Sequence, residues 1–477
     1  MVFTSINFLI FFPITVILFY LTPNKYRWIV LLVASYFFYI NIKPVYAFLT
    51  TGITASTYFF TRLIDKTDVD EKKRKYMVIN IILILLPLFF FKYFNSINHG
   101  TFILLEKFHI RYPLPEISFL LPVGISFYTF MAIGYTVDVY NEEIKSEKNI
   151  GIVALFISFF PLVLSGPIER AKNMLPQFNK LKKINYGLIV QGLKMMLWGY
   201  FMKLVVADRI AIYLDAIYNN IQQHNGNSLL FASLLYPFQV YADLGGYSLI
   251  AIGTAKILGV DVIQNFRRPF FASSMSEFWR RWHMSLITWL TDYVYTPLSF
   301  YFRKYKVWGI VIALLITFFI SGIWHGATLT FIVWGLMQGV FLSIEALTNK
   351  RRNAFEKKYA LTKNVFYVFL SISFTFILFA ASQIFGRAAN IENAINIYSK
   401  IFAERGSLYI EKTTLTYSLI GLCLILLKDF RDEYFPEKFL LFENSNIVIR
   451  YASYLFVVFM ILLVGVLDGG QFIYFQF

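Results

Sequence analysis

Two of the five histidines, His283 and His325, lie among apolar residues rather than in polar loops. Residues 309–323 and 326–347 are apolar runs, and Trp324 and His325 occupy the short break between them. An ionisable side chain at membrane depth is costly, so His325 is a candidate functional residue. Imidazole is also the side chain best suited to proton transfer near neutral pH. The pattern therefore predicts acid–base chemistry at His325, with Trp324 as a supporting neighbour.

The belt formed by residues 265–298 carries further polar candidates, namely Asn265, Arg280, Arg281 and His283. This stretch is too charged for a lipid-facing span and too apolar for an ordinary loop. It predicts a broken or re-entrant helix, because irregular backbone at membrane depth is tolerated only where protein or a wet cavity surrounds it. The arginines could bind phosphates. They could equally be interfacial anchors and internal ion pairs, with Glu277 and Arg281 spaced i, i+4.

Asp243 lies beside Gly245 and Gly246 in another apolar region. The glycines could mark a close helix–helix contact, or Asp243 could orient a histidine or arginine of the belt. His283 could be a hydrogen-bonded structural residue or a second catalytic group. Two histidines without paired cysteines or an HExxH pattern predict no metal site.

Elements that position these residues must be membrane helices. Of 477 residues, 58% are hydrophobic and only 15% are charged, and apolar runs long enough to cross a bilayer recur from Asn7 to Leu467. We expect an all-α polytopic membrane protein, with residues 1–477 as one integral membrane domain of about 10–13 membrane segments. Residues 118–347 form its core motif region. Amphipathic or surface helices are expected within 386–412 and 429–448.

The net charge of +16 comes mainly from lysines and arginines in short loops, among them 65–75, 170–183 and 350–363. The positive-inside rule places these loops in the cytoplasm, and counting spans then places the C-terminus outside. No nucleic-acid motif accompanies the basic residues, so nucleic acid is not an expected partner. The single cysteine, Cys423, excludes an intramolecular disulfide.

Six ordered segments resemble a known family. They are LPVGISFYTFMAIGYTVDVY (121–140), FFPLVLSGPIERAKNMLPQF (159–178), GYFMKLVVADRI (199–210), VYADLGGYSLIAIGTAKILG (240–259), FWRRWHMSLITWLTDYVYTPL (278–298) and SGIWHGATLTFIVWGLMQG (321–339). Together they resemble the membrane-bound O-acyltransferase (MBOAT) family. Their order and spacing are similar to the bacterial branch for alginate O-acetylation, which includes peptidoglycan O-acetylation proteins.

That resemblance implies a helical bundle with broken helices around a central cavity or tunnel. His325 matches the position of the family's principal catalytic histidine, and His283 matches the second histidine of this branch. The implied reaction moves an acyl group from a cytoplasmic thioester, acetyl-CoA, to an acceptor on the other side of the bacterial inner membrane. No tightly bound cofactor is implied. The implied partners are membrane lipid and an extracytoplasmic enzyme of the SGNH serine-hydrolase type, which finishes transfer onto polysaccharide.

The C-terminal aromatic tail, residues 470–477, contains Tyr474. It could anchor at the membrane interface. Alternatively Tyr474 could carry an acyl group, because the tail is similar to the aromatic C-terminal motif of a small partner protein in D-alanylation systems. Within the same family, D-alanyl transfer to teichoic acid is an alternative activity. A transporter or flippase is a different alternative, although the inverted repeats it would show are not seen in the sequence.

Overall fold

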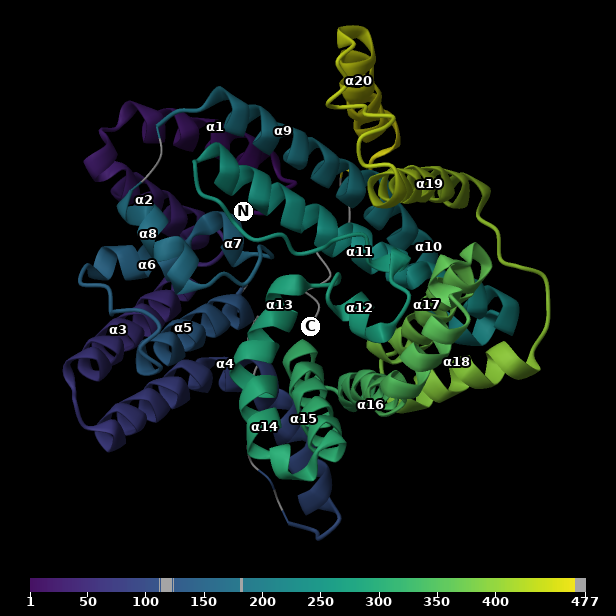
Figure 1. Cartoon of the computed structure of the whole chain (residues 1–477), viewed down its shortest axis with the longest axis horizontal. Coiled ribbons are helices and arrows are strands. Elements are labelled where there is room, and N and C mark those ends of the chain that lie inside the picture. Colours follow the sequence, from purple (N-terminus) through teal and green to yellow (C-terminus); the bar gives the residue numbers. More distant parts are fainter. Residues whose placement is uncertain (111, 113–121, 123, 181–182, 468–477) are drawn as a thin grey trace. The chain divides into compact units, whose positions relative to one another are not determined.

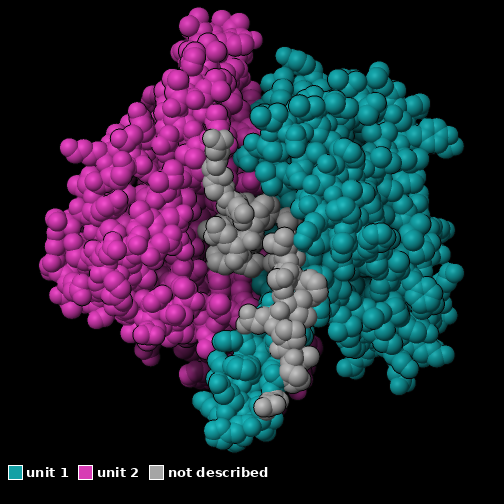
Figure 2. Space-filling model, turned by 180° about the vertical axis from the view of Figure 1, so that it is seen from behind, with its two compact units in different colours: residues 1–193, 251–263 teal, residues 194–250, 264–477 magenta. Residues whose placement is uncertain are grey.

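The computed structural model describes residues 1–110, 112, 122, 124–180 and 183–467. Every regular element in these ranges is a helix, which confirms the all-α expectation. The chain forms two compact units, shown in different colours in Figure 2. Unit 1 contains residues 1–193 and 251–263, and unit 2 contains residues 194–250 and 264–477. The expected single domain of residues 1–477 stays a prediction.

Within the described residues, seven helical segments are long and apolar enough to cross a membrane. They are α4 (Asp70–Glu106), the segment Tyr186–Tyr218, α15 (Val307–His325), α16 (Leu329–Lys358), α17 (Val365–Arg387), α19 (Lys412–Tyr434) and α20 (Ile447–Val464). The shorter apolar helices Ile6–Leu21 and Ile150–Val163 are additional candidates. About 20 apolar residues cross the hydrocarbon core, so shorter helices need a tilt or a thinner bilayer. The expected total of 10–13 segments stays a prediction.

Unit 1 is built from α1 (Ile6–Leu21), α2 (Arg27–Ile40), α3 (Pro44–Lys66), α4, α5 (Ile125–Tyr140), α6 (Ile150–Ser158), α7 (Phe160–Val163) and α8 (Ala171–Asn179). Helix α3 packs against α4, α5 and α6. Asn80 of α4 joins three of them, because it accepts a hydrogen bond from Ser56 (2.7 Å) and donates one to Thr136 (2.8 Å). Buried amides of this kind are stable only when both groups are paired. These two hydrogen bonds therefore link α3, α4 and α5 inside the apolar core of unit 1.

Unit 2 holds all the candidate site residues that the structure describes. Its further elements are the π segment Phe201–Ala207, α10 (Asp208–Tyr218), α12 (Met275–Trp279), α13 (Met284–Leu290), the π segment Thr291–Tyr295, α14 (Thr296–Tyr301) and α18 (Ile391–Ala403). Along the chain, α9 (Tyr186–Tyr200) and α11 (Gly226–Ile257) each begin in one unit and end in the other. Figure 1 shows the element order.

Helices α15 and α16, labelled in Figure 1, pack against each other, and glycines line their contact. A Cβ on Gly322 would lie 2.5 Å from the carbonyl oxygen of Phe331, and a Cβ on Gly335 would collide with the carbonyl oxygen of Phe318. Residues without side chains let the two backbones approach this closely. The short connection between the helices, starting at Gly326, follows His325 directly. The hairpin therefore fixes the position of that histidine.

The predicted broken helix of residues 265–298 is confirmed. The helical backbone is interrupted at residues 280–283, between α12 and α13, and a π segment then joins α13 to α14. The predicted surface helix at 429–448 is wrong. Helix α19 continues to Tyr434, and residues 435–446 form turns. Proline disfavours helical backbone in the residue before it, and Pro436 follows Phe435, which has φ −139°. Helix α20 then starts after Asn446, whose side chain accepts a hydrogen bond from Val448 N.

Candidate functional site

His325 is the last residue of α15, and its side chain is half-buried. Its Nδ1 atom lies 2.7 Å from the carbonyl oxygen of Ser321, one helical turn earlier. A carbonyl oxygen can only accept, so Nδ1 must carry the hydrogen and donate it. In the neutral ring the lone pair then belongs to Nε2. The local helix thus presents His325 as a proton acceptor at Nε2, which is the arrangement a general base requires.

Two tryptophan rings lie beside the imidazole of His325. The ring of Trp324 lies 4.8 Å from the imidazole at 89°, and the ring of Trp334 on α16 lies 4.7 Å away at 65°. Trp324 is also a neighbour of the second histidine, with its ring centre 6.2 Å from that of His283. The two histidines singled out in the sequence therefore border the same indole. Trp334 was missed in the sequence, because an aromatic residue inside an apolar run carries no distinguishing signal.

His283 is 3% exposed and stands directly before α13. Its backbone is left-handed, with φ 45° and ψ 49°. This conformation costs a residue with a Cβ roughly 1–2 kcal/mol. Such strain persists only where neighbouring interactions hold the backbone in place.

Asn265 holds that turn. Its carbonyl oxygen accepts a hydrogen bond from Met284 N (2.8 Å), and its Oδ1 accepts from Ser285 N (3.2 Å) and Ser285 Oγ (2.9 Å). Its Nδ2 donates to Ser248 Oγ on α11 at 3.0 Å. All these groups are buried, so leaving any of them unpaired is costly. Asn265 thus supports His283 by holding the backbone of the two residues that follow it.

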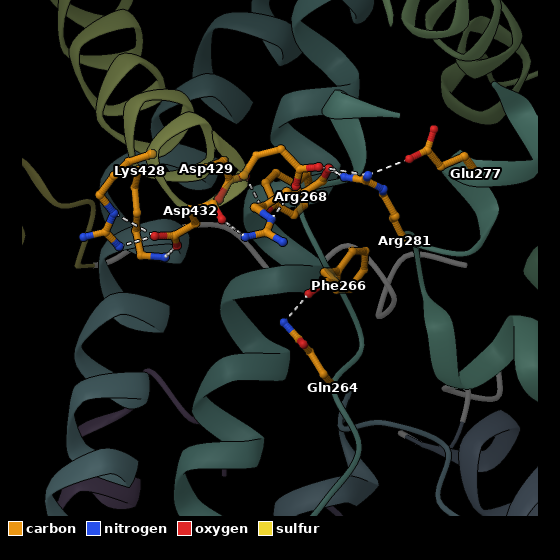
Figure 3. Close-up of polar contacts among 11 residues, drawn as sticks. Gln264, Phe266, Arg268, Glu277, Arg281, Lys428, Asp429 and Asp432 are labelled. Atoms are coloured by element: carbon orange, nitrogen blue, oxygen red, sulfur yellow. Dashed lines mark hydrogen bonds and ion pairs between the residues drawn. The ribbon is translucent and has the colours of Figure 1, made fainter. Parts of the chain in front are cut away.

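Arg281 belongs to an ion-pair network, drawn in Figure 3, that joins the belt to the end of α19. Its Nη2 lies 2.5 Å from Glu277 Oε1, as the i, i+4 spacing predicted, and 3.0 Å from Glu433 Oε1. Arg268 contacts the same glutamate (Nε–Oε2, 2.8 Å) and also donates to the carbonyl oxygen of Asp432. Two carboxylates therefore already face Arg281, which favours the ion-pair interpretation for this residue. Glu433 was not among the sequence candidates.

Glu277 is a half-buried carboxylate of this network and lies outside the seven candidate spans. Burial alone would raise its pKa. Hydrogen bonds from Ser273 N and Oγ, both 2.8 Å, and the ion pair with Arg281 outweigh that effect and lower the pKa. The network therefore holds Glu277 ionised.

Arg280 differs from its neighbour Arg281. Its side chain is exposed, and within the described parts of the chain no carboxylate lies within ion-pair distance of it. An exposed guanidinium that is not already neutralised can bind a phosphate in bidentate fashion. Of the two arginines singled out in the sequence, Arg280 is the one still available to a phosphate-bearing ligand.

Asp243 pairs with a lysine. Its Oδ1 lies 2.6 Å from Lys203 Nζ, and Lys203 also contacts Asp208 Oδ1 at 2.8 Å. All three side chains are at most 5% exposed. Lys203 was missed, although a lone lysine in the apolar run of the π segment was a detectable signal. That Asp243 orients a histidine or arginine stays a prediction.

The expected small-residue contact next to Asp243 is confirmed. A Cβ on Gly246 would lie 2.8 Å from the carbonyl oxygen of Gly199, and a Cβ on Gly199 would lie 2.6 Å from the carbonyl oxygen of Gly246. Helices α9 and α11 therefore approach backbone to backbone at this point. This approach brings Lys203, one turn after Gly199, to Asp243.

Tyr474 and the rest of the tail 470–477 lie outside the described residues. For a metal ion, the described residues contain no group of three or more His, Cys, Asp or Glu side chains placed to hold one.

Comparison with known proteins gives one family. The profile of the membrane-bound O-acyltransferase family matches residues 77–383. A probable alginate O-acetylase of Pseudomonas putida is 32% identical over 405 residues, covering 84% of this chain and 80% of that protein. The peptidoglycan O-acetyltransferase of Helicobacter pylori is 32% identical over 396 residues (78% and 72%). The teichoic acid D-alanyltransferase of Bacillus subtilis is 30% identical over 309 residues (62% and 73%).

Proposed function

Because the chain belongs to the membrane-bound O-acyltransferase family and is a multi-pass membrane acyltransferase, we propose that it takes acetyl groups from cytoplasmic acetyl-CoA. The acetyl groups cross the bacterial inner membrane for O-acetylation of a cell-envelope or secreted polysaccharide. Relatives that acetylate alginate and peptidoglycan, each covering most of this chain, support an acetyl group over other acyl groups.

The Nδ1–H···O contact between His325 and Ser321 is the observation that carries this proposal. Acyl transfer from a thioester needs a hydroxyl oxygen made nucleophilic by a nearby base. With Nδ1 occupied, Nε2 of His325 accepts the hydroxyl proton while that oxygen attacks the acyl carbon. The thiolate of coenzyme A leaves and recovers the proton. General-base assistance of this kind contributes about 10²–10⁴-fold to the rate.

His283 and the belt arginines have supporting roles in this scheme. His283 shares Trp324 with His325, so it orients or polarises the reactants on one side of that indole. Arg280, exposed and without an ion pair among the described residues, binds a phosphate of the donor. Arg281, Asn265 and Asp243 hold the surrounding backbone through the ion pairs and hydrogen bonds described above.

We further propose that the C-terminus lies outside and that an SGNH-type exported enzyme receives the acetyl group there. Tyr474 is the candidate carrier between the two, because a phenol ester is a more activated acyl donor than an alkyl ester. As one integral membrane domain, residues 1–477 would carry the donor side, the catalytic histidines and the exported tail in a single chain.

A second candidate is D-alanyl transfer to teichoic acid. The match to teichoic acid D-alanyltransferases favours it, although that match covers 62% of the chain against 84% for the alginate O-acetylase. The two activities use different donors. D-alanyl transfer takes its acyl group from a carrier protein rather than from coenzyme A.

To distinguish acetyl transfer from D-alanyl transfer, purified protein in liposomes is given either [¹⁴C]acetyl-CoA or a D-alanyl-loaded carrier protein. We expect release of free coenzyme A and acetyl label on a hydroxyl acceptor. If only the D-alanyl donor were consumed, the protein would be a D-alanyltransferase and the acetylation proposal would be wrong. Passage of a solute without turnover of either donor would support a transporter instead.

A further inference from the structure

Two buried indole N–H groups, one of them beside His325, have no hydrogen-bond acceptor among the residues that the structure describes. They belong to Trp334 on α16 and Trp279 on α12, which are 5% and 4% exposed. A buried donor left without an acceptor costs about 1–3 kcal/mol, so most proteins avoid it. Unsatisfied buried donors at a reactive site are therefore candidates for binding something that arrives during the reaction.

Trp334 lies beside the proposed base, and Trp279 lies beside Trp334. The ring centre of Trp334 lies 4.7 Å from that of His325, and Trp279 lies 6.1 Å from Trp334. Phe318 and Phe379 pack on Trp279 at 5.2 and 6.2 Å and surround it with apolar atoms. In such surroundings a single hydrogen bond to a charged atom is much stronger than it is in water.

Their chemistry suits one task. An indole Nε1–H is a donor only, so it cannot compete with His325 for a proton. The charge that develops in acyl transfer is on the carbonyl oxygen of the thioester, which becomes an oxyanion in the tetrahedral intermediate. Fixed donors aimed at that oxygen stabilise the transition state more than the ground state.

We propose that Trp334, assisted by Trp279, supplies the oxyanion hole of the acyl-transfer site. This inference rests on the proposed function. The acceptor hydroxyl oxygen bonds to the acyl carbon while its proton moves to Nε2 of His325. The carbonyl electron pair moves onto the oxygen, where the Trp334 N–H binds it. The pair then reforms the C=O bond, the C–S bond breaks, and the leaving thiolate takes the proton from His325.

The hairpin geometry supports this role. Trp334 adjoins Gly335, whose missing side chain allows α16 to lie against α15. The same contact that places His325 therefore places Trp334 beside it. A donor held on a rigid helix needs no reorganisation during the reaction, which is the condition for electrostatic stabilisation to be large.

The test removes the N–H and keeps the aromatic ring. Trp334→Phe in purified, reconstituted full-length protein is expected to lower kcat for transfer from [¹⁴C]acetyl-CoA by about 10²–10³-fold with little change in KM. Trp279→Phe is expected to lower kcat less. The matched control is Trp282→Phe, a 5% exposed indole of the same aromatic cluster that stacks on Phe278 at 5.4 Å. It should keep kcat within about threefold.

A phenyl ring fills less space than an indole, so Trp334→Phe could also lose stability. Replacement of Trp334 by benzothienylalanine, in which sulfur takes the place of the N–H, avoids this problem. A benzothienyl variant with the wild-type kcat would overturn the proposal, and so would a folded Trp334→Phe protein with the wild-type kcat. Neither result would contradict the proposed function. That function is wrong instead if His325→Ala retains acetyl transfer or if acetyl-CoA is not a donor.

Discussion

His325 donates its Nδ1–H to the carbonyl oxygen of Ser321 at 2.7 Å, within the last turn of α15. Both groups belong to the same helix end, so the helix itself selects the ring tautomer. A backbone carbonyl thus holds the Nδ1 side of this imidazole, where a Ser-His-Asp triad uses a carboxylate. This hydrogen bond leaves Nε2 as the basic atom, and the proton transfer proposed for His325 depends on it.

His283 offers a test that separates backbone strain from side-chain function. Its left-handed backbone favours glycine, so His283→Gly should be more stable to heat than His283→Ala, by about 1 kcal/mol in unfolding free energy. Both variants should lose activity, since both lack the imidazole. Equal melting temperatures would show that the turn relaxes when the side chain is removed.

Asn265 should act on activity through the position of His283. Asn265→Ala removes the acceptor for Ser285 N and Oγ and the donor to Ser248. We expect a loss of about 1–3 kcal/mol in stability and a fall in kcat. Asn80→Ala is a suitable control, because that buried amide also bridges neighbouring helices but belongs to unit 1, whereas Asn265 and His283 belong to unit 2. An unchanged kcat in a folded Asn265→Ala protein would remove its positioning role.

Acid should weaken the network around Arg281. The pKa of Glu277 is lowered in the folded protein, so its stabilising contribution is present above the ordinary glutamate pKa of about 4.3 and is lost as pH falls through the lower folded value. Between pH 6 and pH 3.5, wild type should lose more stability than Glu277→Gln, as measured by thermal unfolding. Glu71→Gln, at an exposed position, should follow wild type. A Glu277→Gln curve parallel to wild type would contradict this sign.

Tyr474→Phe separates the two interpretations of the tail. An aromatic anchor tolerates the loss of one hydroxyl, whereas an acyl carrier cannot. We expect this variant to release coenzyme A only slowly in steady state and to give no labelled C-terminal peptide in mass spectrometry. Normal polysaccharide acetylation by Tyr474→Phe would leave the tail as an anchor.

The sequence indicated the main features of the site because each had a local signature. His325 in the break between apolar runs, the i, i+4 pair of Glu277 and Arg281, and Gly246 in an apolar run were all readable along the chain. The all-α class followed from the recurrence of apolar runs.

Other features could not be read locally. Glu433 meets Arg281 from 152 residues away, and Trp334 is one aromatic residue among many until α16 folds back onto α15. The expected surface helix at 429–448 failed because Pro436 ends helical backbone there, a signal that was present in the sequence. Long-range pairs depend on which helices become neighbours, and periodicity does not encode that choice.

The role of His325 as base is tested most directly by single-turnover transfer from [¹⁴C]acetyl-CoA in proteoliposomes, comparing wild type with His325→Ala. We expect the variant to insert, fold and bind acetyl-CoA normally but to transfer acetyl about 10²–10⁴-fold more slowly. Transfer by folded His325→Ala at the wild-type rate would show that His325 is not the base.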